Sequence, residues 1–106
     1  MSGRLTTHVL DIAAGRPAAG VAITLLRDDR VVADAVTDAD GRAVVLEALE
    51  AGVYELRFAV ADHFASDAEP AFLDVVPVRF GVSDPDSHHH VPLLVAPWAY
   101  STYRGS

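Results

Sequence analysis

The chain has 106 residues, of which 51% are hydrophobic, so we expect a single globular domain over residues 1–106 with one core. The absence of cysteine excludes disulfides and thiolate metal sites, and a net charge of −7 argues against a nucleic-acid partner, which needs a basic surface. No apolar run reaches membrane-spanning length and no secretory signal is recognisable, so we expect no membrane partner and a cytoplasmic location.

Short strands separated by turns follow one another along the chain. Residues 5–11 form the first strand and alternate between a more apolar and a more polar face. A segment rich in turn formers, 13–20, follows it. Further strands are predicted over residues 21–26, 31–36, 43–46, 53–61, 72–80, 88–96 and 99–104. One short helix is predicted over residues 62–69, beginning at Asp62.

Two local features refine this pattern. The polar run TDADGR, residues 37–42, predicts an Asp-Gly hairpin turn. Pro77 lacks a backbone N–H, so the strand over 72–80 is expected at a sheet edge or at a bulge. About eight short strands with one short helix predict an all-β fold, an antiparallel β-sandwich.

Histidines are the groups best suited to chemistry. Because side chains alternate along a strand, His88 and His90 share one face, while His89 lies on the core side with Val91. His8 lies on the outer face of its own strand, so His8 and His90 meet if the two strands are neighbours. Three interpretations remain open: solvated surface histidines, a zinc site formed by His8, His88 and His90, or acid–base chemistry by a neutral histidine.

Arginines and aromatic residues leave similar alternatives. Arg42 follows the Asp-Gly turn and Arg104 lies beside the last glycine, and each is either a surface charge or a ligand-binding group. His63, Phe72 and Trp98 are interpreted as packing residues.

The C-terminal run HVPLLVAPWAYSTYRGS closely resembles the signature of the 5-hydroxyisourate hydrolases, the transthyretin-like enzymes of urate breakdown. The opening THVLD with the following Gly15, Pro17 and Ala18 resembles the same family, as does TDADGR, so the likeness extends over essentially the whole chain. Tyr-Arg-Gly-Ser is the most diagnostic stretch, because transthyretin, a hormone carrier of the same fold, lacks it. His89 departs from the family, which often has an aromatic residue there, and a histidine facing the core needs a hydrogen-bond partner.

The resemblance implies a transthyretin-like (prealbumin-like) β-sandwich of two four-stranded sheets with one short helix. It also implies a homotetramer, a dimer of dimers with sites at the dimer–dimer interface, and metal-independent hydrolysis without a cofactor. The substrate would be an oxidised purine, 5-hydroxyisourate, converted to 2-oxo-4-hydroxy-4-carboxy-5-ureidoimidazoline. The implied catalytic residues are His8, Arg42 and His90. The implied substrate-binding residues are His8, Arg42, Tyr103, Arg104, Gly105 and Ser106.

A mechanism follows from this implied site. One of His8 and His90 deprotonates water while the other orients it or protonates the leaving nitrogen, and Arg42 stabilises the oxyanion. Two other classes stay open beside it. One is a non-enzymatic, transthyretin-like small-ligand binding module, and the other is a zinc-dependent hydrolase.

Overall fold

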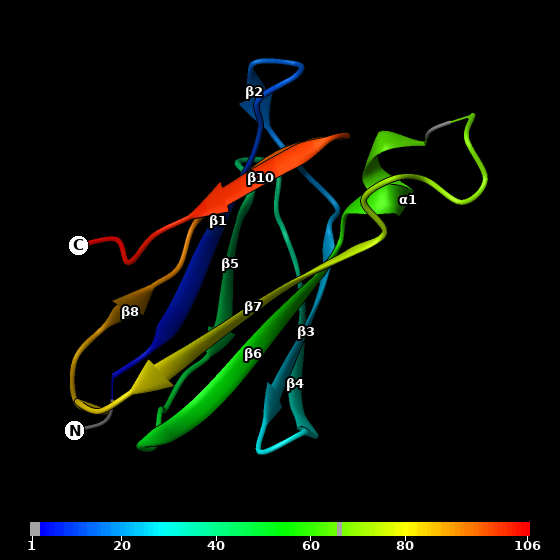
Figure 1. Cartoon of the computed structure of the whole chain (residues 1–106). Coiled ribbons are helices and arrows are strands. Elements are labelled where there is room, and N and C mark those ends of the chain that lie inside the picture. Colours follow the sequence, from blue (N-terminus) through cyan, green and yellow to red (C-terminus); the bar gives the residue numbers. More distant parts are fainter. Residues whose placement is uncertain (1–2, 66) are drawn as a thin grey trace.

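The computed structural model describes residues 3–65 and 67–106, which form two β-sheets and one short helix (Figure 1). One sheet has the strand order β10-β9-β1-β2, with β5 and β8 also paired to β1, and the other has the order β4-β3-β6-β7. The elements are β1 (Leu5–Asp11), β2 (Arg16–Pro17), β3 (Ala22–Arg27), β4 (Arg30–Val36), β5 (Arg42–Leu46), β6 (Gly52–Ala59), α1 (Val60–Phe64), β7 (Val75–Val82), β8 (His89–His90), β9 (Leu93–Ala96) and β10 (Ala99–Thr102).

The β1 sheet has more strand segments than the four predicted. The expected strand over 88–96 is divided into β8 and β9, both parallel to β1, because Pro92 between them has no N–H to donate. The hydroxyl of Thr7 donates to the carbonyl oxygen of Val91 at 2.7 Å and holds the interruption against β1. The division leaves His90 paired with Thr6 near the start of β1.

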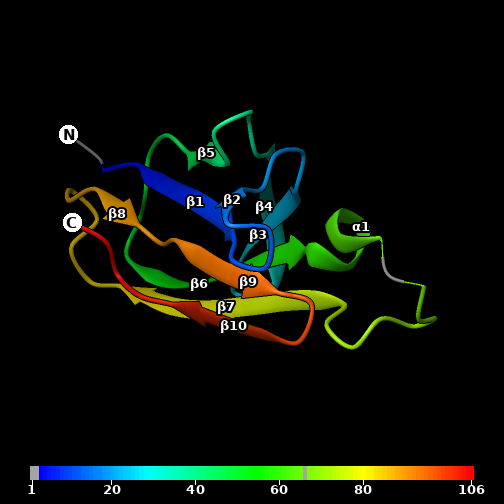
Figure 2. The same cartoon turned by 90° about the horizontal axis from the view of Figure 1, so that it is seen from above.

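The second sheet follows the predicted alternation closely. Tyr54, Leu56 and Phe58 of β6 are buried and join a core cluster drawn from both sheets, which the sandwich encloses. β7, which carries Pro77, lies at the sheet edge, as predicted. Both views show α1 at the end of the molecule opposite β8 and the C-terminus (Figures 1 and 2).

The helix lies earlier in the chain than predicted. It spans Val60–Phe64 rather than 62–69, with Asp62 inside its first turn, and it ends at Ala65 in the left-handed conformation. Burial of Val60 explains the early start, because the alternating stripe of β6 continues into the first residue of the helix. None of the described residues forms a helix with the length and apolarity needed to cross a membrane.

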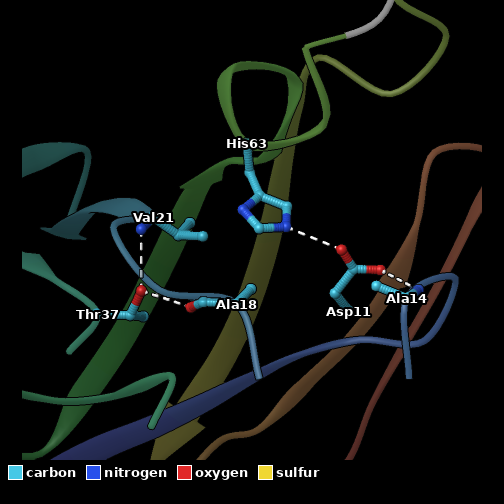
Figure 3. Close-up of polar contacts among 6 residues, drawn as sticks. All are labelled: Asp11, Ala14, Ala18, Val21, Thr37 and His63. Carbon is cyan, nitrogen blue, oxygen red and sulfur yellow. Dashed lines mark hydrogen bonds and ion pairs between the residues drawn. The ribbon is translucent and has the colours of Figure 1, made fainter. Parts of the chain in front are cut away.

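The Asp-Gly segment connects the two sheets, so the prediction of a hairpin turn is wrong. It leaves β4 in one sheet and enters β5, which pairs with β1 in the other. At its start, buried Thr37 donates to the carbonyl of Ala18 at 2.7 Å and accepts the N–H of Val21 at 2.9 Å (Figure 3). At its end, Gly41 has φ +75°, and an added Cβ would lie 2.5 Å from the Val9 carbonyl oxygen. Only glycine therefore fits this crossing.

Of the three expected packing residues, only His63 is partly buried. Its Nε2 lies 2.9 Å from Asp11 Oδ2, and the other oxygen of Asp11 accepts the N–H of Ala14 at 2.8 Å, which ties α1 to the end of β1 (Figure 3). Phe72 and Trp98 are 82% and 68% exposed in the single chain, so the packing prediction is wrong for both. Together with Phe64 and Leu73 they line an apolar pocket between the segment after α1 and the end of β9.

Candidate active site

A cavity of about 380 Å³ lies on the face of β1 that points away from the core. Strands β1, β5 and β8 supply most of its walls, and the last residue of the chain completes it. The lining residues are Arg4, Thr6, Thr7, Asp38, Arg42, Ala43, Val44, His88, His90 and Ser106. Three of the predicted site residues, Arg42, His90 and Ser106, therefore share one cavity.

Strand register explains how distant segments meet there. β1 lies between β5 and β8, with His8 opposite Arg42 on one side and Thr6 opposite His90 on the other. Thr6 and His8 alternate with buried residues of β1, so both point outward from the sandwich. The strands that carry His8 and His90 are therefore neighbours, which is the condition under which the sequence pattern places the two histidines on one outer face.

Asp38 shapes the turn that places Arg42. Its Oδ1 accepts the backbone N–H groups of Asp40 and Arg42, both at 2.9 Å. These bonds, with the contact of Gly41 to Val9, bring the chain onto β1 just where β5 begins. The TDADGR run is thus a connection between the sheets that delivers an arginine to the cavity.

Thr6 lies between two histidines. Its Oγ1 is 2.7 Å from His88 Nε2 and 2.8 Å from His90 Nδ1, and the two ring centroids are 6.2 Å apart. His90 is half-buried, while His88 is exposed to solvent. Because Thr6 engages Nδ1 of His90, the Nε2 atom is the ring nitrogen left for a ligand or a water.

The surroundings of His90 favour its neutral form. Burial is the largest cause and lowers its pKa below the ordinary value of 6.5, and repulsion from His88, Arg42 and His8 lowers the pKa further. A neutral imidazole can accept a proton at physiological pH. His90 therefore has the protonation state that a general base requires.

His8 has a different hydrogen-bonding state. Its Nε2 lies 2.9 Å from the carbonyl oxygen of Asp40, and a carbonyl only accepts, so Nε2 carries the hydrogen. In the neutral ring, Nδ1 of His8 is then an acceptor. This arrangement suits His8 to orient a water molecule beside Arg42, its partner across the strand pair.

The C-terminal residues are divided between two places. The Gly105 N–H donates to the His90 carbonyl at 2.7 Å, and a Cβ on Gly105 would lie 2.6 Å from Cδ2 of that ring, so the terminus packs directly on His90. Tyr103 and Arg104 line a second cavity of about 280 Å³ between β7 and β10. Within one chain the structure thus gathers Gly105 and Ser106 at His90 but not Tyr103 and Arg104.

His89 has the polar partners that its burial demands, as predicted. Its Nδ1 donates to the Ser87 carbonyl at 2.9 Å, and its Nε2 lies 3.1 Å from Asp84 Oδ1. Arg104 binds the other oxygen of Asp84 at 3.2 Å. Hydrogen bonds from Arg104 and Ser87 hold the pKa of Asp84 below its ordinary value, so this carboxylate links the buried histidine to the C-terminal segment.

Six lining residues were not predicted as parts of the site, among them Thr6, Arg4 and Asp38. Thr6 had a usable signal, because strand alternation places it on the face of His8. Arg4 and Asp38 had none, since an exposed charge near a terminus or in a turn is ordinary. Across residues 3–65 and 67–106, no cluster of three or more histidine, aspartate or glutamate side chains is arranged to hold a metal ion.

Comparison with known proteins identifies the family. The model of the HIUase/Transthyretin family matches residues 5–105. The chain is 55% identical to the 5-hydroxyisourate hydrolase of Ralstonia nicotianae, covering 98% of this chain and 99% of that protein.

The chain belongs to the HIUase/Transthyretin family.

Solved structures agree with this family assignment. The structure of Klebsiella pneumoniae 5-hydroxyisourate hydrolase superposes with a TM-score of 0.86 at 37% identity, over 98% of this chain and 99% of that one. An (S)-allantoin synthase superposes with a TM-score of 0.89 at 42% identity, and the likeness covers 99% of this chain but only 44% of that longer one. The predicted transthyretin-like β-sandwich is therefore confirmed for this member of the HIUase/Transthyretin family.

Proposed function

We propose that this member of the family hydrolyses 5-hydroxyisourate in urate degradation, giving 2-oxo-4-hydroxy-4-carboxy-5-ureidoimidazoline without a metal. The observation that carries the proposal is that His90, whose surroundings favour the neutral imidazole, lines one cavity together with Arg42. The chain is also 55% identical, over 98% of its length, to a 5-hydroxyisourate hydrolase. The cavity volume of about 380 Å³ accommodates a small planar heterocycle.

His90 acts as the general base in this proposal. Its Nε2 removes a proton from water, and the hydroxide attacks a carbonyl carbon of a ring amide. Arg42, from the opposite wall of the cavity, stabilises the negative charge that develops on the carbonyl oxygen, a contribution of roughly 3–4 kcal/mol for one well-placed donor. His8 orients the water through Nδ1, because its Nε2–H is engaged by Asp40.

The tetrahedral intermediate then collapses with cleavage of the C–N bond. The leaving nitrogen takes the proton that His90 received, and the product carboxylic acid loses its own proton to solvent. Gly105 and Ser106 position the ring of His90 and the bound substrate. Tyr103 and Arg104 are both exposed beside the second cavity. Their contact with substrate stays a prediction.

We further propose that the active form is a homotetramer. Each sheet ends in an edge strand, β10 in one and β7 in the other, and edge strands offer unpaired backbone groups. Val75 and Tyr100 on these edges and the nearby Trp98 expose large apolar side chains. Pairing of the same edges in two copies forms a two-fold dimer, and two dimers facing each other across the outer side of the β1 sheet would enclose the cavity.

Light scattering tests the assembly directly. The expected mass is four times that of the 11.3 kDa chain. A monomer with full activity would contradict the enclosure of the site by a partner. The cytoplasmic location expected from the sequence remains a prediction.

Ultraviolet decay of freshly generated 5-hydroxyisourate tests the reaction. Urate and urate oxidase supply the substrate, and the decay is followed with the protein, with its His90→Asn variant and with a chelator. We expect acceleration over the spontaneous rate, a loss of roughly 10²–10⁴-fold in the variant, and no effect of the chelator. A folded protein that does not accelerate decay would favour the binding-module alternative, and loss of activity with chelator would favour the zinc alternative.

A further inference from the structure

The contact of Thr6 with two imidazoles couples the protons of His88 and His90. A hydroxyl has a single hydrogen, yet Thr6 Oγ1 lies within hydrogen-bond distance of both His88 Nε2 and His90 Nδ1. Thr6 can donate to only one of these nitrogens, so the other nitrogen must carry a hydrogen and donate to Thr6. Two arrangements satisfy both contacts, and each fixes the tautomers of both rings.

The two arrangements give His90 opposite chemical roles. When Thr6 donates to His88, the Nδ1 of His90 carries the hydrogen, and its Nε2 is bare and can act as a base. When Thr6 donates to His90, that ring carries its hydrogen on Nε2 and can act as an acid. The first state suits attack by water, and the second suits protonation of the leaving nitrogen.

Charge around His90 makes an imidazolium costly at this point. Arg4 and Arg42 line the same cavity, and Asp38 is the lining residue with a carboxylate side chain. His8 does not line the cavity, but its repulsion also acts on His90. Partial burial adds a desolvation cost for a charged ring. His88, in contrast, is exposed to solvent, where a positive charge is hydrated and a proton can be exchanged.

We propose that Thr6 and His88 form a proton relay that joins His90 to solvent and switches this ring between base and acid. The inference rests on the proposed hydrolase function, which it deepens. Thr6 and His88 are positioning and relay residues here, since they act on the substrate through His90.

The protons balance over one cycle. As water attacks, its proton moves to Nε2 of His90, and the proton on Nδ1 of His90 moves to Oγ1 of Thr6. The original hydroxyl proton of Thr6 moves to Nε2 of His88, and His88 releases its Nδ1 proton to solvent. As the C–N bond breaks, Nε2 of His90 gives its proton to the nitrogen, and one proton returns from solvent along the same path. The net change is addition of water across the C–N bond, and His90 need not hold a full positive charge.

Three variants separate a relay from simple support of His90. Thr6→Val removes the hydroxyl at nearly constant volume, Thr6→Ser restores it, and His88→Gln keeps a hydrogen-bonding group that cannot take up one proton and release another. We expect kcat to fall roughly 10²-fold in the valine and glutamine variants with little change in KM, and the serine variant to recover most of the rate. Thr24→Val on β3, in the other sheet, is the matched control and should leave kcat unchanged.

Isotope and pH measurements distinguish the relay from a structural role. The wild-type rate in mixtures of H₂O and D₂O should show several protons in flight, and the valine and glutamine variants should show one. The acidic limb of the plot of kcat against pH should shift in both variants, because the proton from His90 can no longer be transferred through Thr6 and His88 to solvent. Wild-type kcat in either Thr6→Val or His88→Gln would overturn the relay.

Nitrogen NMR tests the coupling even if the hydrolase proposal fails. Long-range ¹⁵N–¹H spectra of the substrate-free protein report which ring nitrogens carry hydrogen. Near neutral pH, one but not both of His88 Nε2 and His90 Nδ1 should be protonated, and Thr6→Val should remove this correlation. Two bare or two protonated nitrogens would refute the coupling. Coupled tautomers in a protein that does not hydrolyse 5-hydroxyisourate would instead refute the proposed function.

Discussion

Replacement of Gly105 by alanine should disable the site through a single methyl group. An ideal Cβ on Gly105 lies 2.6 Å from Cδ2 of His90 and 3.3 Å from both Cβ and Cγ of that residue. Carbon atoms at van der Waals contact are about 3.5–4.0 Å apart, so the methyl group forces a displacement of about 1 Å. The clash is with the ring that we assign as the base.

Neither possible displacement is without cost. If the imidazole moves, the 2.8 Å contact of its Nδ1 with Thr6 is lost, and if the terminus moves, the 2.7 Å bond from Gly105 N–H to the His90 carbonyl is lost. Loss of one such bond costs about 0.5–1.5 kcal/mol of stability. A misplacement of about 1 Å at a catalytic group can cost about 10²-fold in rate. The expected result is thus a large loss of kcat with a small loss of stability.

The assay combines substrate decay with a thermal melt. Gly81→Ala is the matched control, because a Cβ there meets no atom within 4 Å and its φ is not in the left-handed region. We expect Gly105→Ala to melt within a few degrees of the wild type while losing roughly 10²-fold in kcat, with the control unchanged in both. Normal kcat in Gly105→Ala would refute the reasoning, since it would mean that the terminus does not position His90 during the reaction.

Three further predictions follow from the charges. Burial and neighbouring positive charge hold the pKa of His90 below its ordinary value of 6.5, so the midpoint of the acidic limb of kcat/KM against pH should lie below 6.5; a midpoint above that value would contradict His90 as base. Arg42→Gln should lower kcat by about 10²–10³-fold, measured by substrate decay, and an unchanged kcat would remove Arg42 from oxyanion stabilisation. Burial raises the pKa of Asp11, but hydrogen bonds from His63 and Ala14 outweigh this effect and hold the pKa below 3.8. The Asp11 carboxylate therefore stabilises the fold above pH 3.8, and this contribution is lost as the pH falls through the lowered pKa. Asp11→Asn should therefore lower Tm by about 4–8 °C at pH 7 and by less near pH 3, and an equal loss at both pH values would contradict the stabilising role of the Asp11 carboxylate.

The fold was largely predictable because the alternation of apolar and polar residues along each strand indicates which side chains are buried. Tyr54, Leu56 and Phe58 alternate with polar residues, and this alternation alone requires a strand with one buried face. The exception was α1, where burial of Val60 rather than the capping preference of Asp62 decided the start. Phe72 and Trp98 show the opposite failure, since large apolar side chains suggest packing but the single chain leaves them exposed.

The candidate site was predictable only as a set of residues. Alternation placed His8 and His90 on outer faces, and the family resemblance pointed to Arg42 and the C-terminal residues. No local pattern indicated that Thr6 bridges two histidines, because that contact joins residues 84 positions apart. Turn chemistry alone also does not distinguish a hairpin from a crossing between sheets at TDADGR, because the difference lies in the pairing of β5 with β1 rather than with β4.

What the sequence by itself determined is therefore the inventory: short alternating strands, an all-β class, and a set of histidines and arginines able to exchange protons and bind oxygen atoms. Only the tertiary structure decided which of them meet. The parallel pairing of β8 with β1 and the antiparallel pairing of β5 with β1 bring His90, Thr6 and Arg42 to one cavity, and they lower the pKa of His90 by burial and by neighbouring positive charge. Strand pairing is a long-range interaction, set by how two apolar faces fit together, and the pKa of a side chain depends on that packing.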